Sequence, residues 1–369
     1  MLEGSLSWMS SSYSGNLYII AGEASGDKLG SRIIDNLEGV EISGVGGPLM
    51  EARGFCSLFN INEISVGGIW EAARSILKIR KLIQKTVDDI VLKKPRVILT
   101  IDSPEFCFRV ACRVKSIMPE AKLIHLVAPS VWAWRPNRAK SIARMYNHIM
   151  TLFDFEPPYF TKYGLPATFV GHPAIEEFHE SQCDSKESAL LLMPGSRVQE
   201  VKSHLPVFLE AAKKIEADRI VVPTIDSIRP LVESMINDKR IEVISDESEK
   251  MELYRKASFA IVASGTATLH LALSSCPMAV CYRMSPVSYA IIKRLVKVEY
   301  ISLANIILGE KVVPELIQGA CTPMEIVKAI SHIDRVQQTS SFRKIRSRLL
   351  LNGMLPSKAI STTLGQYLV

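Results

Sequence analysis

The sequence lacks the short motifs by which many enzymes hold metal ions or nucleoside triphosphates. It has no C-x-x-C pair, no cysteine–histidine cluster at zinc spacing, no H-E-x-x-H, no G-x-x-x-x-G-K-[ST] and no aspartate-x-aspartate triplet. These absences disfavour a zinc site and a P-loop. The double glycine Gly46-Gly47 is not part of a G-x-G-x-x-G fingerprint, which disfavours a nicotinamide cofactor. We therefore expect neither a metal nor a cofactor.

The sequence also has only a small excess of charge of one sign, and its cysteines show no spacing typical of disulfides. The 44 basic and 38 acidic residues leave a net charge of +6, a mild bias toward phosphates or an anionic lipid surface that is too weak to predict nucleic-acid binding. Seven cysteines without a metal or disulfide spacing favour reduced thiols in a cytosolic protein. Residues 1–15 are rich in serine and lack the charged and apolar regions of a signal peptide, so we expect a loose leader.

One apolar stretch is long enough to span a bilayer. Residues Ala257 to Tyr282 contain no Asp, Glu, Lys or Arg. Ser264-Gly265-Thr266, Ser274-Ser275 and Pro277 interrupt this stretch, however, with residues typical of turns. We expect a strand, a turn, a short helix and a strand here, and no transmembrane helix.

The length of 369 residues suits two domains, and 47% hydrophobic with 22% charged residues is ordinary globular composition. Apolar strand patterns alternate with helical patterns in both halves, which predicts two doubly wound, Rossmann-like α/β domains facing a cleft. The last strand of the first half is expected at His148–Leu152, and no strand after Ile301. The predicted divisions are a leader (1–15), a first domain (16–173), a linker (174–188), a second domain (189–320) and a helical tail (321–369) that packs back on the first domain.

The stretch LLLMPGSRVQEV, Leu190 to Val201, predicts an anion site. A buried strand leads into the turn Gly195-Ser196 and then into a helix, whose free N–H groups and dipole favour a negative charge. Arg197 adds a cation with bidentate reach to a phosphate. The turn Ser264-Gly265-Thr266 repeats this arrangement, and together the two turns suit a nucleotide diphosphate. The alternatives are that the first turn is only a loop and that Ser264 and Thr266 are helix caps.

Asp102 follows the predicted strand Val97 to Ile101, at the end of a parallel strand where open α/β sheets bind their ligands. It is either a general base for a substrate hydroxyl or a cap of the helix that starts at Pro104. The loop Pro129 to Arg135 holds Trp132 and Trp134, which either line a pocket or plug the end of the sheet.

The clearest predicted helix runs from Ile69 to about Lys94. Its apolar stripe lies opposite a basic row that contains Arg74, Lys78 and Lys81, and Trp70 and Leu77 lie beside that row. This pattern is typical of a surface helix with a solvated basic face. The alternative is a helix on an anionic membrane, with Trp70 and Leu77 inserted.

Nine segments resemble the lipid-A-disaccharide synthase family, in the family's order and over roughly residues 17–320. They are AGEASGD (21–27), GVGGPLMEARG (44–54), IDSPEF (101–106), PSVWAWR (129–135), GHP (171–173), PGSR (194–197), ASGTATL (263–269), YRMSP (282–286) and VEYISLANIILG (298–309). PSVWAWR and AGEASGD are the most distinctive of the nine.

The resemblance implies an inverting glycosyltransferase of the GT-B type in lipid A biosynthesis, peripherally bound to the cytoplasmic face of the inner membrane. The donor would be UDP-2,3-diacylglucosamine and the acceptor the 6-hydroxyl of 2,3-diacylglucosamine 1-phosphate (lipid X). A homodimer is implied as well, in which the C-terminal tail swaps between subunits.

By the same resemblance Asp102 is the catalytic base. The residues expected to bind the UDP-sugar are Ser25, Gly195, Ser196, Arg197, Glu200, Ser264, Gly265, Thr266 and Asn305. The sequence departs from the family at Glu105-Phe106-Cys107 (usually Asp-Phe-Asn), at His270 (usually Glu) and at Ala304 (usually Pro). Two rival functions stay open: a UDP-sugar 2-epimerase, which shares the two-domain cleft, and an inactive nucleotide-sugar-binding protein.

Overall fold

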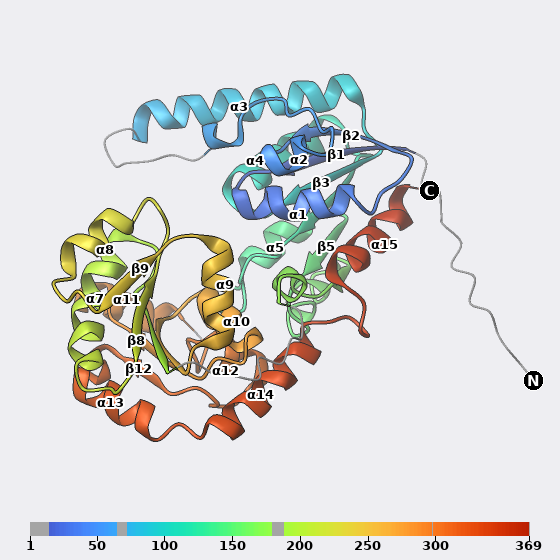
Figure 1. Ribbon diagram of the computed structural model, residues 1–369. Helices are drawn as coiled ribbons and strands as arrows, with labels where there is room; N and C mark the ends of the chain where they lie inside the picture. The colour runs from blue at the N-terminus through green and yellow to red at the C-terminus, as the bar shows by residue number, and fades with distance from the viewer. Residues whose placement is uncertain (1–14, 65–71, 179–187, 297, 369) are drawn as a thin grey trace, which may run out of the picture. The chain divides into compact units, whose positions relative to one another are not determined.

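The computed structural model describes residues 15–64, 72–178, 188–296 and 298–368 of the chain (Figure 1). They form two compact units: unit 1 runs to Pro173 and resumes at Leu350, and unit 2 spans Ala174–Leu349. Each unit is built on a six-stranded sheet in which all neighbouring strands are parallel. The prediction of two doubly wound α/β sheets is confirmed.

The sheet of unit 1 has the order β2-β1-β3-β4-β5-β6. Its strands are β1 (Gly15–Ala21), β2 (Val40–Val45), β3 (Val97–Ile101), β4 (Lys122–Leu126), β5 (His148–Thr151) and β6 (Ala167–Phe169). Its helices are α1 (Ala24–Ile34), α2 (Pro48–Glu51), η1 (Ile61–Glu63), α3 (Ala72–Lys93), α4 (Pro104–Ile117), α5 (Arg138–Ala143), α6 (Pro158–Thr161) and α15 (Pro356–Leu368).

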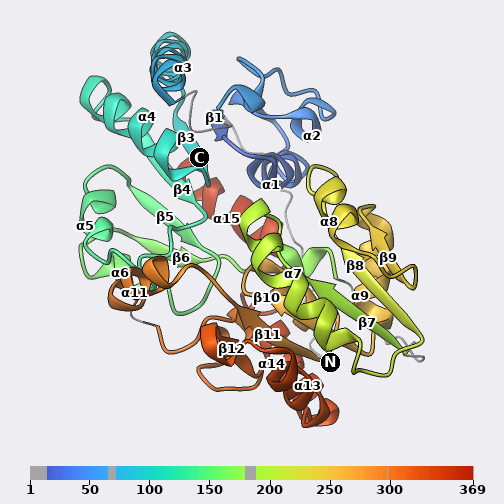
Figure 2. The same cartoon turned by 90° about the vertical axis from the view of Figure 1, so that its left-hand side faces the viewer.

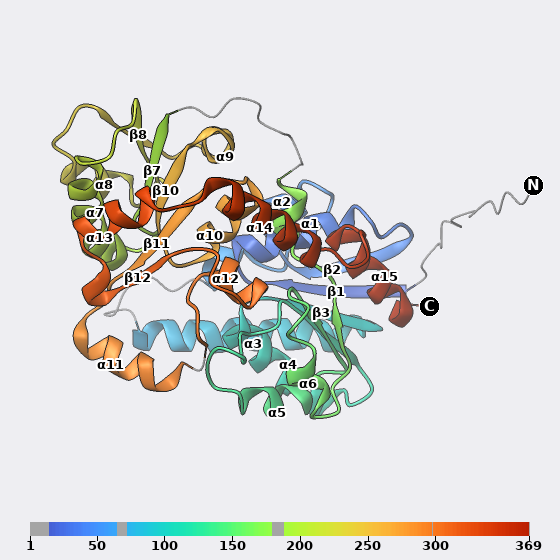
Figure 3. The same ribbon diagram turned by 90° about the horizontal axis from the view of Figure 1, so that it is seen from below.

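Strand β1 shows why this sheet is covered on both faces. Tyr18 and Ile20 pack with residues of α3, α4 and α5, whereas Leu17 and Ile19 pack with residues of α1 and α15 (Figure 3). All four side chains are fully buried. Because successive side chains of a strand point to opposite faces, a strand covered on both sides is apolar at every position.

The sheet of unit 2 has the order β12-β11-β10-β7-β8-β9. Its strands are β7 (Ala189–Met193), β8 (Arg219–Pro223), β9 (Ile241–Ile244), β10 (Phe259–Ala263), β11 (Met278–Tyr282) and β12 (Glu315–Ile317). Its helices are η3 (Pro173–Glu176, which begins at the last residue of unit 1), α7 (Val198–Ala212), α8 (Arg229–Met235), α9 (Glu247–Lys256), α10 (Thr266–Leu273), α11 (Pro286–Leu295), α12 (Leu303–Leu308), η4 (Gln318–Ala320), α13 (Pro323–Ser331) and α14 (Arg335–Arg348).

Helix α7 lies over the sheet of unit 2 (Figure 2). Val201, Leu205 and Phe208 recur at helical spacing and are fully buried in one core with Leu190 and Leu192 of β7. Helices α8 and α13 extend this layer, while α10 packs on the other face with α9, α12 and α14. The core therefore fixes the turn that leads from β7 into α7.

Two short edge strands are missing from the sequence-based prediction. β6 pairs with β5, so His148–Thr151 is not the last strand of the first half, and β12 pairs with β11, so strands continue after Ile301. Each has three half-buried residues. A run of three residues is too short to show strand periodicity, and an edge strand is paired on one side only.

The helical tail divides between the two units. Helix α13 packs on α7 and β11, and α14 packs on α10 and α12, so both belong to unit 2. Helix α15 packs on α1 and β1 in unit 1. The expected return of residues 321–369 to the first domain therefore applies to α15 alone, because Ile326 and Ile330 of α13 are part of the core of unit 2.

Some predicted segments lie outside the described residues. These are residues 1–14 of the expected leader, 179–187 of the expected linker, and Ile69 to Glu71 at the start of the predicted helix. Within the described ranges, no helix has both the length and the hydrophobicity needed to cross a bilayer.

Candidate functional site

In both sheets the strand order reverses next to the turns that the sequence singles out. In unit 1 the reversal lies between β1 and β3, and Ala21 pairs with Ile101, so the turns after these two strands are neighbours. In unit 2 it lies between β7 and β10, where Val262 pairs with Met193. Open α/β sheets bind ligands at such switch points, outside the carboxyl ends of the strands. Each unit thus has one candidate site.

In unit 1 the turns after β1 and β3 meet closely. Asp102 and Ser103 both have left-handed backbone angles, with φ of 51° and 45°. The hydroxyl of Ser25 donates to Asp102 Oδ2 at 3.3 Å, and that of Ser103 donates to Glu23 Oε1 at 3.1 Å. Only glycine fits at position 22, because a Cβ there would lie 2.5 Å from Ser103 Cβ. Asp102 and Ser103 are not glycines, so their left-handed backbone angles indicate local strain that the surrounding fold maintains. Such strain is common at active sites.

The alternative role of Asp102 as a helix cap is not what the structure shows. The N-cap of α4 is Ser103, which makes no side-chain cap bond, and the Asp102 carboxylate instead accepts the Ser25 hydroxyl. Asp102 is half-buried at the end of β3. The carboxylate is therefore oriented by Ser25 and retains acceptor capacity for a substrate hydroxyl.

Asp27, which ends the AGEASGD motif, is a structural residue. Its buried carboxylate accepts hydrogen bonds from the backbone N–H groups of Gly47, Leu49 and Met50 at 2.9 to 3.0 Å. A Cβ at Gly47 would lie 2.6 Å from Asp27 Oδ2. The double glycine thus makes room for this internal carboxylate, which joins the turn after β1 to the start of α2.

The tryptophan loop fills the end of the sheet of unit 1. Trp132 packs edge-on against Phe155 at 5.2 Å and donates its Nε1–H to the buried Glu156 at 2.9 Å. Burial is the main cause that raises the pKa of Glu156, to about 7, although three donors oppose the shift. Trp134 is 43% exposed, with the Arg135 guanidinium 4.4 Å from its ring centre. Of the two roles predicted for the tryptophans, Trp132 therefore fits the one that closes the end of the sheet, whereas Trp134 faces solvent.

In unit 2 a carboxylate of the chain occupies the predicted anion turn. Glu200 Oε2 accepts the N–H groups of Ser196 and Arg197 at 3.2 and 3.4 Å, and Oε1 accepts Arg197 Nη1 at 2.9 Å. Gly195 has φ 111°, and a Cβ there would collide with Glu200. The turn therefore does present amide donors to an anion, as strand–glycine–helix geometry predicts. The guanidinium of Arg197 is largely exposed.

The second turn leaves the start of α10 uncapped. The N-cap is Gly265, and no side chain caps the helix. The hydroxyl of Ser264 donates to the carbonyl of Ile301 at 2.7 Å, so Ser264 is not the cap either. Thr266 is the first helical residue. The first N–H groups of α10 thus keep donor capacity for a ligand.

One cavity of about 440 Å³ joins the two turns of unit 2. It is lined by Gly195, Ser196, Arg197, Glu200, Ser264, Gly265 and Thr266, and also by Met193, Pro223, Thr224, Ile225, Lys250, Tyr254, Ala263 and Ala267. A neighbouring cavity of about 780 Å³, between α7 and α11, shares Arg197 and Glu200 with it. The first volume lies within the range of about 300–1,000 Å³ typical of small-molecule sites. Seven of the predicted UDP-binding residues are therefore brought together.

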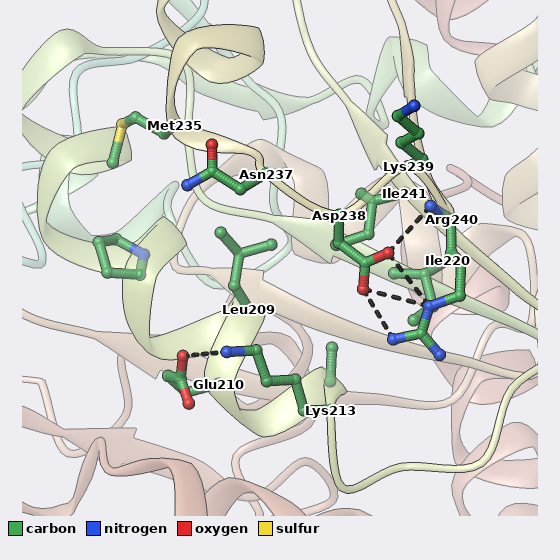
Figure 4. Close-up of a pocket in the computed structure, with 12 residues that line it drawn as sticks. Leu209, Glu210, Lys213, Ile220, Met235, Asn237, Asp238, Lys239, Arg240 and Ile241 are labelled. Atoms are coloured by element: carbon green, nitrogen blue, oxygen red, sulfur yellow. Dashed lines mark hydrogen bonds and ion pairs between the residues drawn. The ribbon is translucent and has the colours of Figure 1, made fainter.

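Another cavity of about 580 Å³ lies at the opposite ends of the strands (Figure 4). It is lined by Ile220 and Ile241, near the amino ends of β8 and β9. Lys213 pairs with Glu210 at 2.6 Å, and Arg240 pairs with Asp238 at 2.7 Å. Since open α/β sheets bind ligands at the other edge, this cavity is not the candidate site.

Asn305 is not brought to the cavity. It is fully buried, its Nδ2 donates to Val313 O and Glu315 Oε1, and its Oδ1 accepts the N–H groups of Val312 and Val313, all at 2.9 Å. These four bonds use the whole capacity of an amide side chain. In this structure the Asn305 amide has no hydrogen-bonding capacity left for UDP, and it ties α12 to the segment that leads into β12.

Three of the five residues predicted to contact a membrane lie in the described part of helix α3 and are exposed. Leu77 is 60% exposed, and Lys78 pairs with Glu63 at 3.4 Å on the surface. Lys81 is also exposed. Trp70 lies outside the described residues, and nothing is described of the Arg74 side chain. Among the described residues, no group of three or more His, Cys, Asp or Glu side chains is placed to hold a metal ion.

The comparison with known proteins agrees with this geometry. The family model described as lipid-A-disaccharide synthetase matches residues 17–355. The lipid-A-disaccharide synthase of Rickettsia typhi is 39% identical over 353 residues, which cover 91% of this chain and 93% of that protein. The chain belongs to the lipid-A-disaccharide synthase family. It is an enzyme of lipid A biosynthesis, a glycosyltransferase with the GT-B fold.

Two solved structures share the fold. The UDP-GlcNAc 2-epimerase of Neisseria meningitidis has a TM-score of 0.62 at 11% identity, over 95% of this chain and 100% of that one. MurG of Acinetobacter baumannii has a TM-score of 0.57 at 13% identity, over 96% and 99%. At such identities the likeness shows the fold alone. The epimerase therefore does not compete with the lipid-A-disaccharide synthase family as the identity of this chain.

None of the residues that depart from the family motifs lines the 440 Å³ cavity of unit 2. Glu105 is exposed and pairs with Arg138 at 3.0 Å. Cys107 is fully buried, and burial, with smaller contributions from the charges of Asp102 and Glu23, raises the pKa of its thiol. His270 packs against Phe178 at 5.3 Å between ring centres and does not line the 440 Å³ cavity. None of the three removes Asp102 or the two turns.

Proposed function

We propose that this protein transfers 2,3-diacylglucosamine from UDP-2,3-diacylglucosamine to the 6-hydroxyl of 2,3-diacylglucosamine 1-phosphate. The products are a tetraacyl-disaccharide 1-phosphate and UDP, formed with inversion at the anomeric carbon. The observation that carries the proposal is the cavity in which the turns at Gly195 and Gly265 meet. Family membership supplies the class of substrate, a lipid A precursor.

The donor's diphosphate is proposed to bind at the two turns of unit 2. It replaces the Glu200 carboxylate on the N–H groups of Ser196 and Arg197 and accepts further N–H groups at the start of α10. Arg197 then pairs with a phosphate instead of Glu200. These contacts strengthen as charge develops on the leaving UDP, and such preorganised donors usually make the greatest contribution to catalysis.

Asp102 is proposed as the general base. Its carboxylate, held by Ser25, accepts the proton of the acceptor's 6-hydroxyl as the oxygen attacks the anomeric carbon. A positioned base typically contributes about 10²–10⁴-fold to the rate. The backbone strain at Asp102 and Ser103 supports a functional role, since left-handed non-glycine residues cluster at active sites.

We also propose that the protein contacts the membrane surface and forms a homodimer. Exposed Leu77, with Lys78 and Lys81 on the same helix, supports a peripheral contact of α3 with the cytoplasmic face of the inner membrane; the predicted contact includes Trp70 and Arg74. Binding to vesicles with and without anionic lipid tests this contact. A homodimer is proposed from family membership and is tested by the molar mass in solution.

The decisive experiment supplies both diacylated substrates in detergent, with EDTA and no added metal. The expected result is disaccharide, identified by mass, and one UDP released per disaccharide. The donor incubated alone tests the epimerase alternative, because a change of configuration at C2 without an acceptor would replace the proposed reaction. UDP binding without turnover would contradict the proposal in favour of an inactive binding protein.

A further inference from the structure

We propose that the Thr224 hydroxyl recognises the nucleoside of the donor, on the side of the 440 Å³ cavity formed by the loop after β8. This inference rests on the proposed function, since it takes a UDP-sugar as the ligand. Thr224 follows β8 and lines the cavity together with Pro223 and Ile225, while α9 contributes Lys250 and Tyr254.

The first argument is an unpaired polar group in the wall of the cavity. Thr224 is 6% exposed, and its Oγ1 has no hydrogen-bond partner among the residues that the structure describes. Burying a hydroxyl without a partner is unfavourable, and native proteins rarely leave one so. Thr224 lines the cavity, so a ligand there can supply the partner once the side chain turns toward it.

The second argument is that the surrounding structure holds Thr224 in place. Its N–H donates to the carbonyl of Ile244 at 2.8 Å, and its carbonyl accepts Lys250 Nζ at 3.0 Å. Lys250 is itself only 5% exposed and pairs with the exposed carboxylate of Glu247. A buried lysine that spans from α9 to a backbone carbonyl fixes the backbone of the loop, so the position from which the Thr224 side chain reaches a ligand is preorganised.

The third argument is the chemistry of this side of the cavity. The two turns offer amide donors and a cation to the diphosphate, whereas Pro223, Ile225 and Tyr254 offer mainly apolar surface. A pyrimidine nucleoside has apolar faces and a polar edge with both donors and acceptors. A hydroxyl group can donate and accept, so it suits such an edge. Thr224 is thus a specificity-determining residue, and Lys250 positions it.

The test replaces Thr224 by the isosteric valine and measures UDP and inorganic pyrophosphate binding by calorimetry. T224V should weaken UDP binding by about two- to tenfold and leave pyrophosphate binding unchanged. T224S, which keeps the hydroxyl, should retain most of the UDP affinity. The free T224V protein should melt no lower than the unsubstituted protein, because it no longer buries an unpaired hydroxyl.

Ser274 provides the matched control. Its buried hydroxyl also lacks a partner among the described residues, but it lies at the end of α10 and does not line the cavity. S274A should therefore leave UDP binding unchanged. Equal UDP affinity of T224V and the unsubstituted protein would overturn this inference alone, as would an effect confined to the sugar-bearing donor. Absence of UDP binding by the unsubstituted protein would overturn the proposed function and this inference with it.

Discussion

At the switch point of unit 1, the turns present the carboxylates of Glu23 and Asp102, held by the hydroxyls of Ser103 and Ser25. At the switch point of unit 2, the turns present backbone amides and the guanidinium of Arg197. The two sheets share a parallel six-stranded design, yet one set of turns presents carboxylates and the other presents hydrogen-bond donors and a cation. The fold therefore fixes where a ligand binds, and the turn residues fix what happens there.

The largest effect is expected when the proposed proton acceptor of unit 1, Asp102, is replaced. D102N keeps the size of the side chain and its bond with Ser25 but cannot take up a proton at neutral pH, so kcat should fall about 10²–10⁴-fold. UDP affinity should not change, because the groups proposed to hold UDP are the amides and Arg197 at the turns of unit 2, and not Asp102. E105Q is the matched control, since Glu105 is exposed. A D102N enzyme with normal kcat would end the role of Asp102 as base.

The buried carboxylate of Glu156 in unit 1 is expected to make the stability of the protein depend on pH. Burial raises the pKa of Glu156 to about 7, above its unfolded value. Its contribution to stability is therefore fully present below about pH 4.5 and is lost as pH rises through about 7, by an amount on the order of 3 kcal/mol. In urea unfolding from pH 5 to 8, E156Q should lose this slope. An unchanged slope in E156Q would show that another group is responsible.

Asp27 and Glu200 sharpen the comparison, since each is a carboxylate that accepts backbone N–H groups. Asp27 is buried, and its hydrogen bonds belong to the folded structure. Glu200 accepts N–H groups that are proposed to bind a phosphate of the donor instead. D27N replaces one acceptor oxygen by an amide that faces an N–H donor, which should lower the free energy of unfolding by about 2–3 kcal/mol. The control is D35N, which breaks only a surface pair with Arg53 and should cost less than about 1 kcal/mol. Equal losses in the two variants would contradict this assignment.

The features that could be predicted from the sequence are local in the chain. The turn at Gly195, the turn at Ser264 and the position of Asp102 each follow directly from a buried strand, so pattern and turn chemistry place them. Asn305 could not be placed this way, because its partners are Val313, in the segment before β12, and Glu315, the first residue of β12. The segment VEYISLANIILG, which contains Asn305, also resembles the family, and the resemblance implies a UDP contact. It gives no sign that the amide forms structural hydrogen bonds instead.

Thr224 and the edge strands show the same limit over longer distances. Thr224 becomes a cavity residue only because β8 lies next to β7 and because Lys250 of α9 reaches its carbonyl. No local pattern marks a single threonine after a strand. β6 and β12 depend likewise on the neighbour that they pair with. Sequence patterns thus predict the sites that lie on one turn, and pairing between distant segments decides the rest.

A smaller effect than those of D102N, E156Q and D27N is expected for R197K, which keeps the positive charge at the turn of unit 2 and changes only the geometry of its hydrogen bonds. A guanidinium binds a phosphate through two parallel N–H groups, whereas an ammonium is a point charge. UDP affinity should therefore fall about tenfold by calorimetry, as for the loss of one charge-assisted hydrogen bond. K202M is the control, since Lys202 lines only the neighbouring cavity. If K202M weakened UDP binding more than R197K, the diphosphate would belong to the cavity between α7 and α11, and the amide turns would lose their proposed role.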